Sequence, residues 1–370
     1  MIDAHADIVG SLLRPPALLA AQEKLRAGDI GRAAFKVVED EAVDFCIALQ
    51  QDAGLRVVTD GEMRRLSFQS QILEAVDGFG AWDIDAFLWG DWKGDGAIGD
   101  KATGRPPELG VVAKLVRHRH LSAEEFTYAR ARANATIKVT LTSPSLFANL
   151  WSPELSKAAY PTLESFLEDV TKILREEVEE LVRLGCAYIQ IDAPHYPLLI
   201  DPRTRAFYEE QGWSVAEWLD LGIGLDNRLM EGIGEDVTFS FHLCRGNQGS
   251  RWLAEGGYEA IARPIFQGIK AQRLMLEYDD ERSGDFTPLD EVPADKTVVL
   301  GLVTTKHGVL EDADALARRI DEAARHVPLE RLAISPQCGF ATSVVGNALS
   351  IDEQRAKLEL LCEVAERVWG

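Results

Sequence analysis

The sequence predicts an α/β protein in which parallel strands close into a (β/α)8 barrel of the TIM type. Two observations support this prediction. Short apolar and β-branched segments alternate with amphipathic helical segments, a pattern typical of parallel strands joined by helices. Eight such strand segments occur within the 370 residues. Barrels of this length commonly form one domain, so a single domain is predicted for residues 1–370, and a doubly wound sheet is the alternative.

The N-terminal third contains the first three predicted strands. Residues 5–11 form a short apolar segment that ends in Gly-Ser, and residues 55–62 and 135–144 are the next two strands. Helical spacing of apolar residues predicts helices over 17–27 and 33–53. The connection over about 63–134 is too long for one loop, so we predict an insertion on the rim, a lid or a partner surface.

The remaining strands and helices alternate more regularly. A helix over about 162–184 should end at Gly185, because glycine readily adopts the left-handed conformation of a helix C-cap. Amphipathic helices are predicted in the last two gaps between strands, at 313–327 and 352–369. The five strands of this part are predicted at 187–194, 237–244, 273–279, 296–305 and 331–338.

Composition excludes several classes of function. The net charge of −21 argues against nucleic acid as a partner and against attraction to an anionic membrane. No apolar run approaches the roughly 18 residues of a membrane span, and the N-terminus has no signal-peptide pattern. The five cysteines are scattered, as in a protein of the reducing cytoplasm, and a homo-oligomer is left open.

One glycine pattern formally matches a dinucleotide-binding motif. Gly94, Gly96 and Gly99 have the spacing G-x-G-x-x-G. The pattern follows a Trp- and Asp-rich loop instead of a strand, and no helix follows it. A pyrophosphate would therefore meet no helix N-terminus, and a nucleotide site is not predicted.

Polar residues at predicted strand ends indicate a metal site. His242 and Cys244 are two residues apart in a strand, so their side chains share one face. Glu277 and Cys338 end two later strands, and in a parallel barrel these ends surround the active site. One His, two Cys and one Glu suit zinc, although a satisfied His and a core Cys are the structural alternative. Such a site would bind a thiol as thiolate, with Glu277 as the displaceable ligand, so alkyl transfer to sulfur is predicted.

The ordered motifs of the chain resemble those of a known family. The sequence is similar over essentially its whole length to the catalytic barrel of cobalamin-independent methionine synthase, especially its short single-barrel relatives. The motifs that carry the resemblance are VGSLLRP (9–15), VTDGE (58–62), IQIDAP (189–194), FHLCRGN (241–247), LEYDDERSG (276–284), GLVTTKH (301–307) and SPQCGF (335–340).

The resemblance implies roles for eight residues. It implies zinc ligands at His242, Cys244, Glu277 and Cys338. It also implies a site for an amino-acid thiol, with Gly10 and Ser11 at the carboxylate and with Glu62 and Asp192 at the ammonium group. Two carboxylates suit an ammonium group, and a Gly-Ser turn suits a carboxylate.

Three features depart from the family pattern. The N-terminal barrel of the full-length family is missing here, which leaves the methyl donor open. Ala193 stands where the family commonly has an acidic residue. Either Lys306 or His307 could replace the strand-seven histidine of the family. We expect His307 to donate the proton to the leaving group, since an imidazole is suited to proton donation near neutral pH.

These observations predict a zinc-dependent enzyme. It would transfer a methyl group from a methyltetrahydrofolate-type donor to the thiol of homocysteine, giving methionine. One alternative alkylates another thiol, as epoxyalkane–coenzyme M transferases of similar barrel structure do. Another alternative is a non-catalytic barrel that binds a metal or a ligand.

Overall fold

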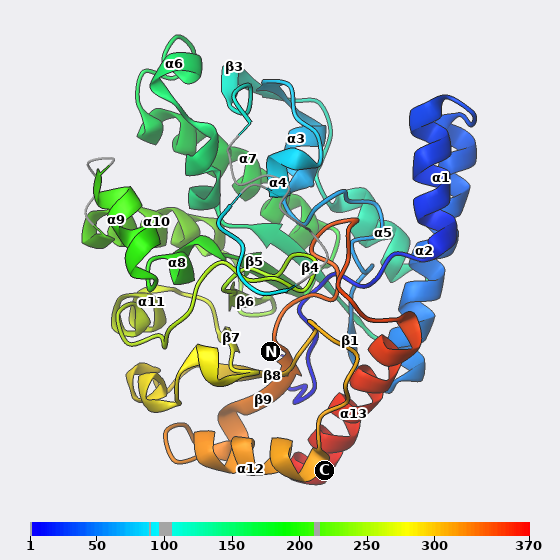
Figure 1. The fold of residues 1–370 in the computed structure, drawn as a ribbon, viewed down its shortest axis with the longest axis vertical. Coiled ribbons are helices and arrows are strands. Elements are labelled where there is room, and N and C mark those ends of the chain that lie inside the picture. Colours follow the sequence, from blue (N-terminus) through cyan, green and yellow to red (C-terminus); the bar gives the residue numbers. More distant parts are fainter. Residues whose placement is uncertain (1, 89, 96–105, 211–214) are drawn as a thin grey trace.

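A curled parallel sheet of seven strands lies at the centre of the protein (Figure 1). The computed structural model describes residues 2–88, 90–95, 106–210 and 215–370. Neighbouring strands follow the order β1-β4-β5-β6-β7-β8-β9, without the reversal of order found in a doubly wound sheet. The strands are β1 (Val57–Val58), β4 (Thr136–Thr142), β5 (Tyr188–Asp192), β6 (Thr238–Leu243), β7 (Arg273–Glu277), β8 (Thr297–Val303) and β9 (Leu332–Pro336).

Helices surround this sheet on its outer side (Figure 1). Every residue of β5, β6, β7 and β9 is buried, because the helices cover one face and the interior of the curl covers the other. The helices are α1 (Pro16–Ala27), α2 (Arg32–Asp52), α3 (Ser70–Ala75), α4 (Asp85–Leu88), α5 (Ala123–Arg130), α6 (Pro153–Ser156), α7 (Leu163–Arg183), α8 (His195–Leu198), α9 (Pro202–Glu210), α10 (Val215–Met230), α11 (Ala262–Gly268), α12 (Ala313–Ala323) and α13 (Ile351–Trp369).

The 3-10 helices complete the connections between these elements. The first, η1, follows β4 directly and carries side chains that reach the central cavity described below. These short helices are η1 (Pro144–Leu150), η2 (Glu281–Ser283), η3 (Thr287–Glu291) and η4 (Leu329–Arg331).

A closed barrel of eight strands was predicted, but the hydrogen bonds of the described residues form an open sheet of seven strands. The predicted first strand, 5–11, makes one isolated parallel bridge, between Ala6 and Ile334 of β9. On the other side, the Leu12 N–H donates to the Gly61 carbonyl beyond β1, at 3.0 Å. The segment thus touches both edges of the sheet, but its ladder is too short to count as a strand.

The helix before β5 ends as the sequence predicts. Gly185 has φ +89°, and its N–H donates to the Val182 carbonyl at 2.9 Å. The Cys186 N–H donates to the Leu181 carbonyl, also at 2.9 Å, which completes a Schellman motif. The chain then enters β5 and places Asp192 at the C-terminal end of that strand.

The insertion over about 63–134 has its own small sheet. It contains α3, α4, α5 and an antiparallel pair, β2 (Val76–Phe79) with β3 (Val111–Arg117). Gly96 and Gly99 of the glycine pattern lie outside the described residues. Among the helices described, none is long and apolar enough to cross a membrane.

Candidate metal centre

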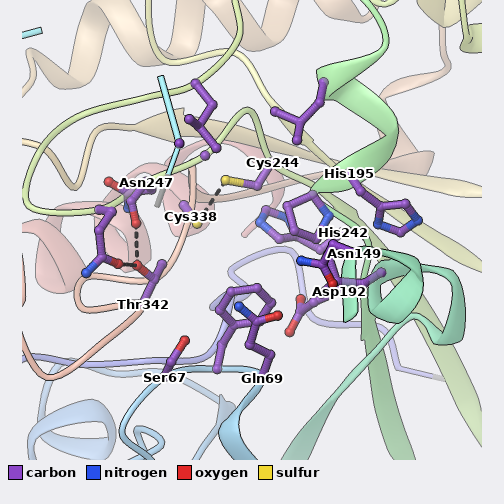
Figure 2. Close-up of a pocket in the computed structure, with 18 of the residues that line it drawn as sticks. Ser67, Gln69, Asn149, Asp192, His195, His242, Cys244, Asn247, Cys338 and Thr342 are labelled. Atoms are coloured by element: carbon purple, nitrogen blue, oxygen red, sulfur yellow. Dashed lines mark hydrogen bonds between the residues drawn. The ribbon is translucent and has the colours of Figure 1, made fainter. Parts of the chain in front are cut away.

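A cavity of about 420 Å³ opens at the C-terminal ends of the parallel strands. Its walls come from the N-terminal segment, the insertion and the loops after β1, β4, β5, β6 and β9. Figure 2 shows several of the lining side chains, with Asp192, Asn149 and His195 on the same side as His242. Six residues predicted for the site line this cavity: Ser11, Glu62, Asp192, His242, Cys244 and Cys338.

Three of these residues form a compact cluster. One ligand atom each of His242, Cys244 and Cys338 lies within 4.8 Å of the others. The two sulfur atoms are 3.3 Å apart and face each other (Figure 2). His242 lies in β6, Cys244 directly follows that strand, and Cys338 follows β9, which β7 and β8 separate from β6 in the sheet. The cluster therefore depends on strands far apart in the chain.

The cluster fits a thiophilic divalent cation. His242 is buried, yet neither of its ring nitrogens has a hydrogen-bond partner among the described residues, which is costly for a buried imidazole. The hydrogen bond with Cys338 and burial raise the pKa of Cys244 well above its ordinary value. A cation between these groups would bind the imidazole and both thiolates, so the donor set matches a soft metal site.

Glu277 lies next to this cluster but outside the group of three. It ends β7, and its Oε2 accepts a hydrogen bond from the Arg245 N–H at 2.8 Å. Its Oε1 accepts from Arg282 at 2.6 Å, and the Lys306 ammonium is 3.8 Å away. Burial alone would raise the pKa of Glu277, but the charges of Arg282 and Lys306 outweigh it and lower that pKa to about 2. The carboxylate is thus ionised and already paired with cationic side chains.

Glu62 presents one free carboxylate oxygen in the buried wall of the cavity. It has φ +56°, directly after Gly61 at φ +67°, a left-handed pair that is unusual for a residue with a side chain. Its Oε1 accepts from the Thr140 hydroxyl at 2.7 Å. Its Oε2 is buried and has no partner in the described structure. A strained backbone with an unsatisfied carboxylate is typical of a binding site.

Asp192 lies beside the metal cluster, since it pairs in register with His242 on the next strand. Its Oδ1 accepts from the Gln190 amide at 2.7 Å. Burial is the main cause that raises the pKa of Asp192 to about 6, and the nearby Glu62 adds to it. A cationic group of a ligand would relieve both effects.

The Gly10-Ser11 turn packs tightly against this carboxylate wall. A Cβ on Gly10 would lie 2.9 Å from a methyl carbon of Thr140 and 3.0 Å from Oε1 of Glu62. A Cβ on Gly339 would lie 2.0 Å from the Ser11 hydroxyl. Glycine at both positions lets three segments meet at one wall, with Ser11 lining the cavity.

Comparisons with known proteins agree with this geometry. The family described as “Cobalamin-independent synthase, Catalytic domain” matches residues 5–367. This chain belongs to the cobalamin-independent methionine synthase family. An uncharacterized protein of Bacillus subtilis, YxjG, is 35% identical over 99% of this chain and 94% of its own length. A methionine synthase of Pyrococcus abyssi is 26% identical over 90% of this chain and 85% of its own length.

A solved structure supports the same assignment. The putative vitamin-B12-independent methionine synthase of Listeria monocytogenes superposes with a TM-score of 0.75 and is 27% identical. The match covers 100% of this chain and 99% of that one. The fold of this synthase-family chain is therefore an α/β fold with a curled parallel sheet.

The structure does not bring His307, the predicted acid of this family member, to the cavity. The chain after β8 turns outwards, and His307 is exposed and bridges Ala348 through its backbone. Lys306, the neighbouring candidate, is paired with Asp279 at 2.5 Å. Neither is among the described residues that line the cavity. This placement gives no support to His307 as proton donor.

Sequence reasoning missed His195 and Asn149, which line the same cavity of this synthase-family chain. His195 directly follows the IDAP motif, so its place after a strand end was a usable signal. Asn149 lies in η1, and nothing in its sequence context marks it. Both have a buried polar atom without a partner in the described structure, Nδ1 of His195 and Oδ1 of Asn149.

The two polar residues after Cys244 hold the loops around the metal cluster. Arg245 is fully buried and donates to the carbonyls of Gly256 and Ser283 at 3.0 and 3.2 Å. Asn247 donates through its amide to the Gly339 carbonyl at 2.8 Å, in the loop that carries the second thiol. Their role is to fix the loops after β6, β7 and β9 relative to one another.

Proposed function

We propose that this protein is a zinc-dependent S-methyltransferase that moves a methyl group from a methyltetrahydrofolate-type donor to the thiol of homocysteine. The observation that supports this most is the buried cluster of His242, Cys244 and Cys338, whose imidazole has no hydrogen-bond partner in the described structure. It shares one cavity of about 420 Å³ with Glu62 and Asp192, two buried carboxylates. Family membership supports the same reaction class.

The residues of the chain have separable tasks in this reaction. His242, Cys244 and Cys338 would hold the zinc ion. When bound, zinc supplies the positive charge that keeps a thiol deprotonated at neutral pH. Glu62 and Asp192 accept hydrogen bonds from the ammonium group of homocysteine, which fixes the direction of its side chain towards the cluster. The Ser11 hydroxyl, which lines the same cavity, would donate to the carboxylate of the same amino acid.

The proposal keeps Glu277 as a metal ligand, but only as a weak one. With Arg282 at 2.6 Å from its carboxylate, Glu277 would have to leave that pair before it could bind a metal ion. We propose that it acts as the weakest of the four ligands, and that the other three keep the metal in place without it.

Coenzyme M fits the cavity less well than homocysteine. It carries a sulfonate and no ammonium group, so Glu62 and Asp192 would repel it instead of pairing with it. The two carboxylates therefore favour an amino-acid thiol over the epoxyalkane–coenzyme M reaction. A purely metal-binding protein would have no use for either carboxylate.

The proposal also includes a closed barrel. The segment from Ala6 to Leu12 bonds to β9 at one end and reaches the loop after β1 at the other. We infer that it takes the place of the first strand between these two edges. Such a position would carry Gly10 and Ser11 to the same rim as the other strand ends.

Zinc-edge X-ray absorption spectroscopy on the zinc-loaded protein tests the proposal. We expect two sulfur ligands in the free protein, from Cys244 and Cys338, and a third when homocysteine is added. Coenzyme M should add none at the same concentration. A sulfur count that homocysteine leaves unchanged would overturn the proposed acceptor. Full zinc occupancy without methylation of any thiol would instead favour the non-catalytic alternative.

A further inference from the structure

A chain of four hydrogen-bonding side chains runs from the cavity into the protein interior. Nε2 of His195 lies 2.8 Å from the Ser145 hydroxyl, which lies 3.3 Å from the Tyr196 hydroxyl. The Tyr196 hydroxyl donates to Oδ2 of Asp226 at 2.7 Å. These residues come from α8, η1 and α10, so three separate elements build the chain.

Both ends of this chain are unusual for a purely structural network. At the cavity end, Nδ1 of His195 is buried without a hydrogen-bond partner in the described structure. At the inner end, Asp226 is fully buried, and its Oδ1 has no hydrogen-bond partner in the described structure. A network that served only packing would leave neither a free imidazole nitrogen nor a buried carboxyl oxygen without a partner.

We propose that His195 is the catalytic proton donor to the leaving group of the methyl donor, supplied through Ser145, Tyr196 and Asp226. This inference rests on the proposed methyl transfer. The thiolate sulfur forms a bond to the methyl carbon, the bond from that carbon to the donor nitrogen breaks, and the electron pair stays on nitrogen. Nδ1 of His195 gives its proton to that nitrogen.

The other three residues restore the proton of the ring. With its carboxyl group protonated, Asp226 donates to the Tyr196 hydroxyl, the reverse of the bond that the tyrosine makes to an ionised carboxylate. In that state Nε2 of His195 takes the proton of the Ser145 hydroxyl, Ser145 takes that of Tyr196, and Tyr196 takes the carboxyl proton of Asp226. Asp226 is left as a carboxylate. The proton lost by the next homocysteine thiol restores the carboxyl group, so each turnover moves one proton from thiol to leaving group and the balance closes.

The electrostatics of the two ends agree with this direction of transfer. Burial lowers the pKa of His195 to about 3, so its ring is neutral at neutral pH. A neutral imidazole can give up one proton only if its other nitrogen gains one, which is the task of Ser145. Burial raises the pKa of Asp226 to about 7, so its carboxyl group holds a proton in a large share of molecules at that pH.

Single-turnover methyl transfer from methyltetrahydrofolate to homocysteine, with zinc-loaded protein, tests the relay. His195→Asn should lower the rate by about 10²- to 10⁴-fold, the usual contribution of a positioned proton donor. Homocysteine affinity and zinc content should stay unchanged. Ser145→Ala removes only the hydroxyl next to Nε2 and should lower the rate by at least roughly 10-fold. His118→Asn, an exposed histidine of the insertion, is the matched control and should leave the rate unchanged.

Chemical rescue separates catalysis from structure. Added imidazole should restore part of the rate to His195→Ala, because a free base can occupy the vacated space and carry the proton. A rate in His195→Asn equal to that of the unchanged protein would overturn the relay and leave the proposed function standing. Loss of rate together with loss of homocysteine binding, without rescue, would assign His195 a structural role and also overturn it. If the unchanged protein transfers no methyl group, the proposed function fails, and the relay fails with it.

Discussion

Two buried polar clusters lie side by side at the ends of the central strands, and they differ in how their groups are paired. His242, Cys244 and Cys338 have no charged partner, and both nitrogens of the imidazole lack a hydrogen bond in the described structure. In the neighbouring cluster, Arg282 lies 2.6 Å from Glu277, and Lys306 lies 2.5 Å from Asp279. The first cluster holds a buried imidazole without a hydrogen bond, and the second holds its charges in ion pairs within the chain.

The difference shows which buried polar groups mark a binding site. A paired charge cluster stabilises the loops that carry it and needs nothing from outside the chain. An unpaired cluster destabilises the free protein, because buried polar atoms lose their bonds to water without replacing them. Its presence at the ends of two strands, β6 and β9, is therefore better explained by a bound cation than by stability.

The largest effect is expected where the unpaired cluster loses a ligand. Cys338→Ser should reduce zinc affinity by more than about 100-fold, since even indirect contacts to a metal contribute about 10- to 100-fold. Methyl transfer should disappear with the metal. Zinc content after dialysis and the transfer rate measure both effects.

The control for this change is Cys362→Ser, a cysteine on α13 outside the cluster. It should keep normal zinc content and rate. A Cys338→Ser protein that retains stoichiometric zinc would show that the unpaired cluster is not the metal site.

The paired cluster should respond in stability instead of metal binding. Arg282→Met leaves the Glu277 carboxylate buried without its nearest cation, and breaking such a pair commonly costs about 3–5 kcal/mol. Zinc stoichiometry should stay the same, because Arg282 is not part of the three-residue group. Denaturant unfolding of the zinc-free protein measures the loss.

Arg263→Met provides the comparison on the surface. Arg263 pairs with Glu291 at 3.0 Å in an exposed position, where water screens the pair, so its removal should leave the free energy of unfolding almost unchanged. Equal stability losses for the two variants would contradict the distinction between a buried and an exposed pair.

The sequence predicted the strand ends well because that prediction needs only local patterns. Seven of the eight predicted strands are present in the sheet, and His242 and Cys244 share a face because strand periodicity requires it. The first predicted strand forms only a single bridge, because its pairing depends on β9, more than 300 residues away. Such long-range bonding leaves no local pattern.

The sequence could not show which of the two clusters would be paired, because that pairing also depends on contacts between distant segments. Glu277 ends its strand as predicted, but Arg282 and Lys306 decide whether its carboxylate is free. Their approach depends on side-chain directions in two loops. His195 was missed because its hydrogen-bond partner, Ser145, lies on another element, and only the folded surroundings leave Nδ1 of the histidine without a partner.

Asp192 tests whether the carboxylates next to the unpaired cluster bind substrate. Asp192→Asn should raise the KM for homocysteine by about 10- to 100-fold, the range of one charge-assisted hydrogen bond. Zinc content should not change. Asp91→Asn alters an exposed carboxylate that also lines the cavity, and its KM should stay within roughly twofold of normal. An unchanged KM in Asp192→Asn would remove this residue from the amino-acid site.

The smallest effect concerns His195, which combines features of the two clusters. One of its ring nitrogens has a hydrogen-bond partner, as in the paired cluster, and the other has none, as in the unpaired cluster. Burial lowers the pKa of His195 to about 3, below the value of about 6.5 for an exposed imidazole. Between these two pH values the unfolded chain binds more protons at this position than the folded protein does. The free energy of unfolding therefore falls as the pH drops from 6.5 towards 3, by up to about 1.4 kcal/mol per pH unit from this residue alone. His195→Asn removes that contribution, so its stability should fall less steeply with acid than that of the unchanged protein, whereas His118→Asn should keep the original slope. Urea unfolding at several pH values between 4 and 7 gives the slope of the unfolding free energy against pH for all three proteins. Equal slopes for His195→Asn and the unchanged protein would mean that the ring is charged, and hence partnered, in the folded state.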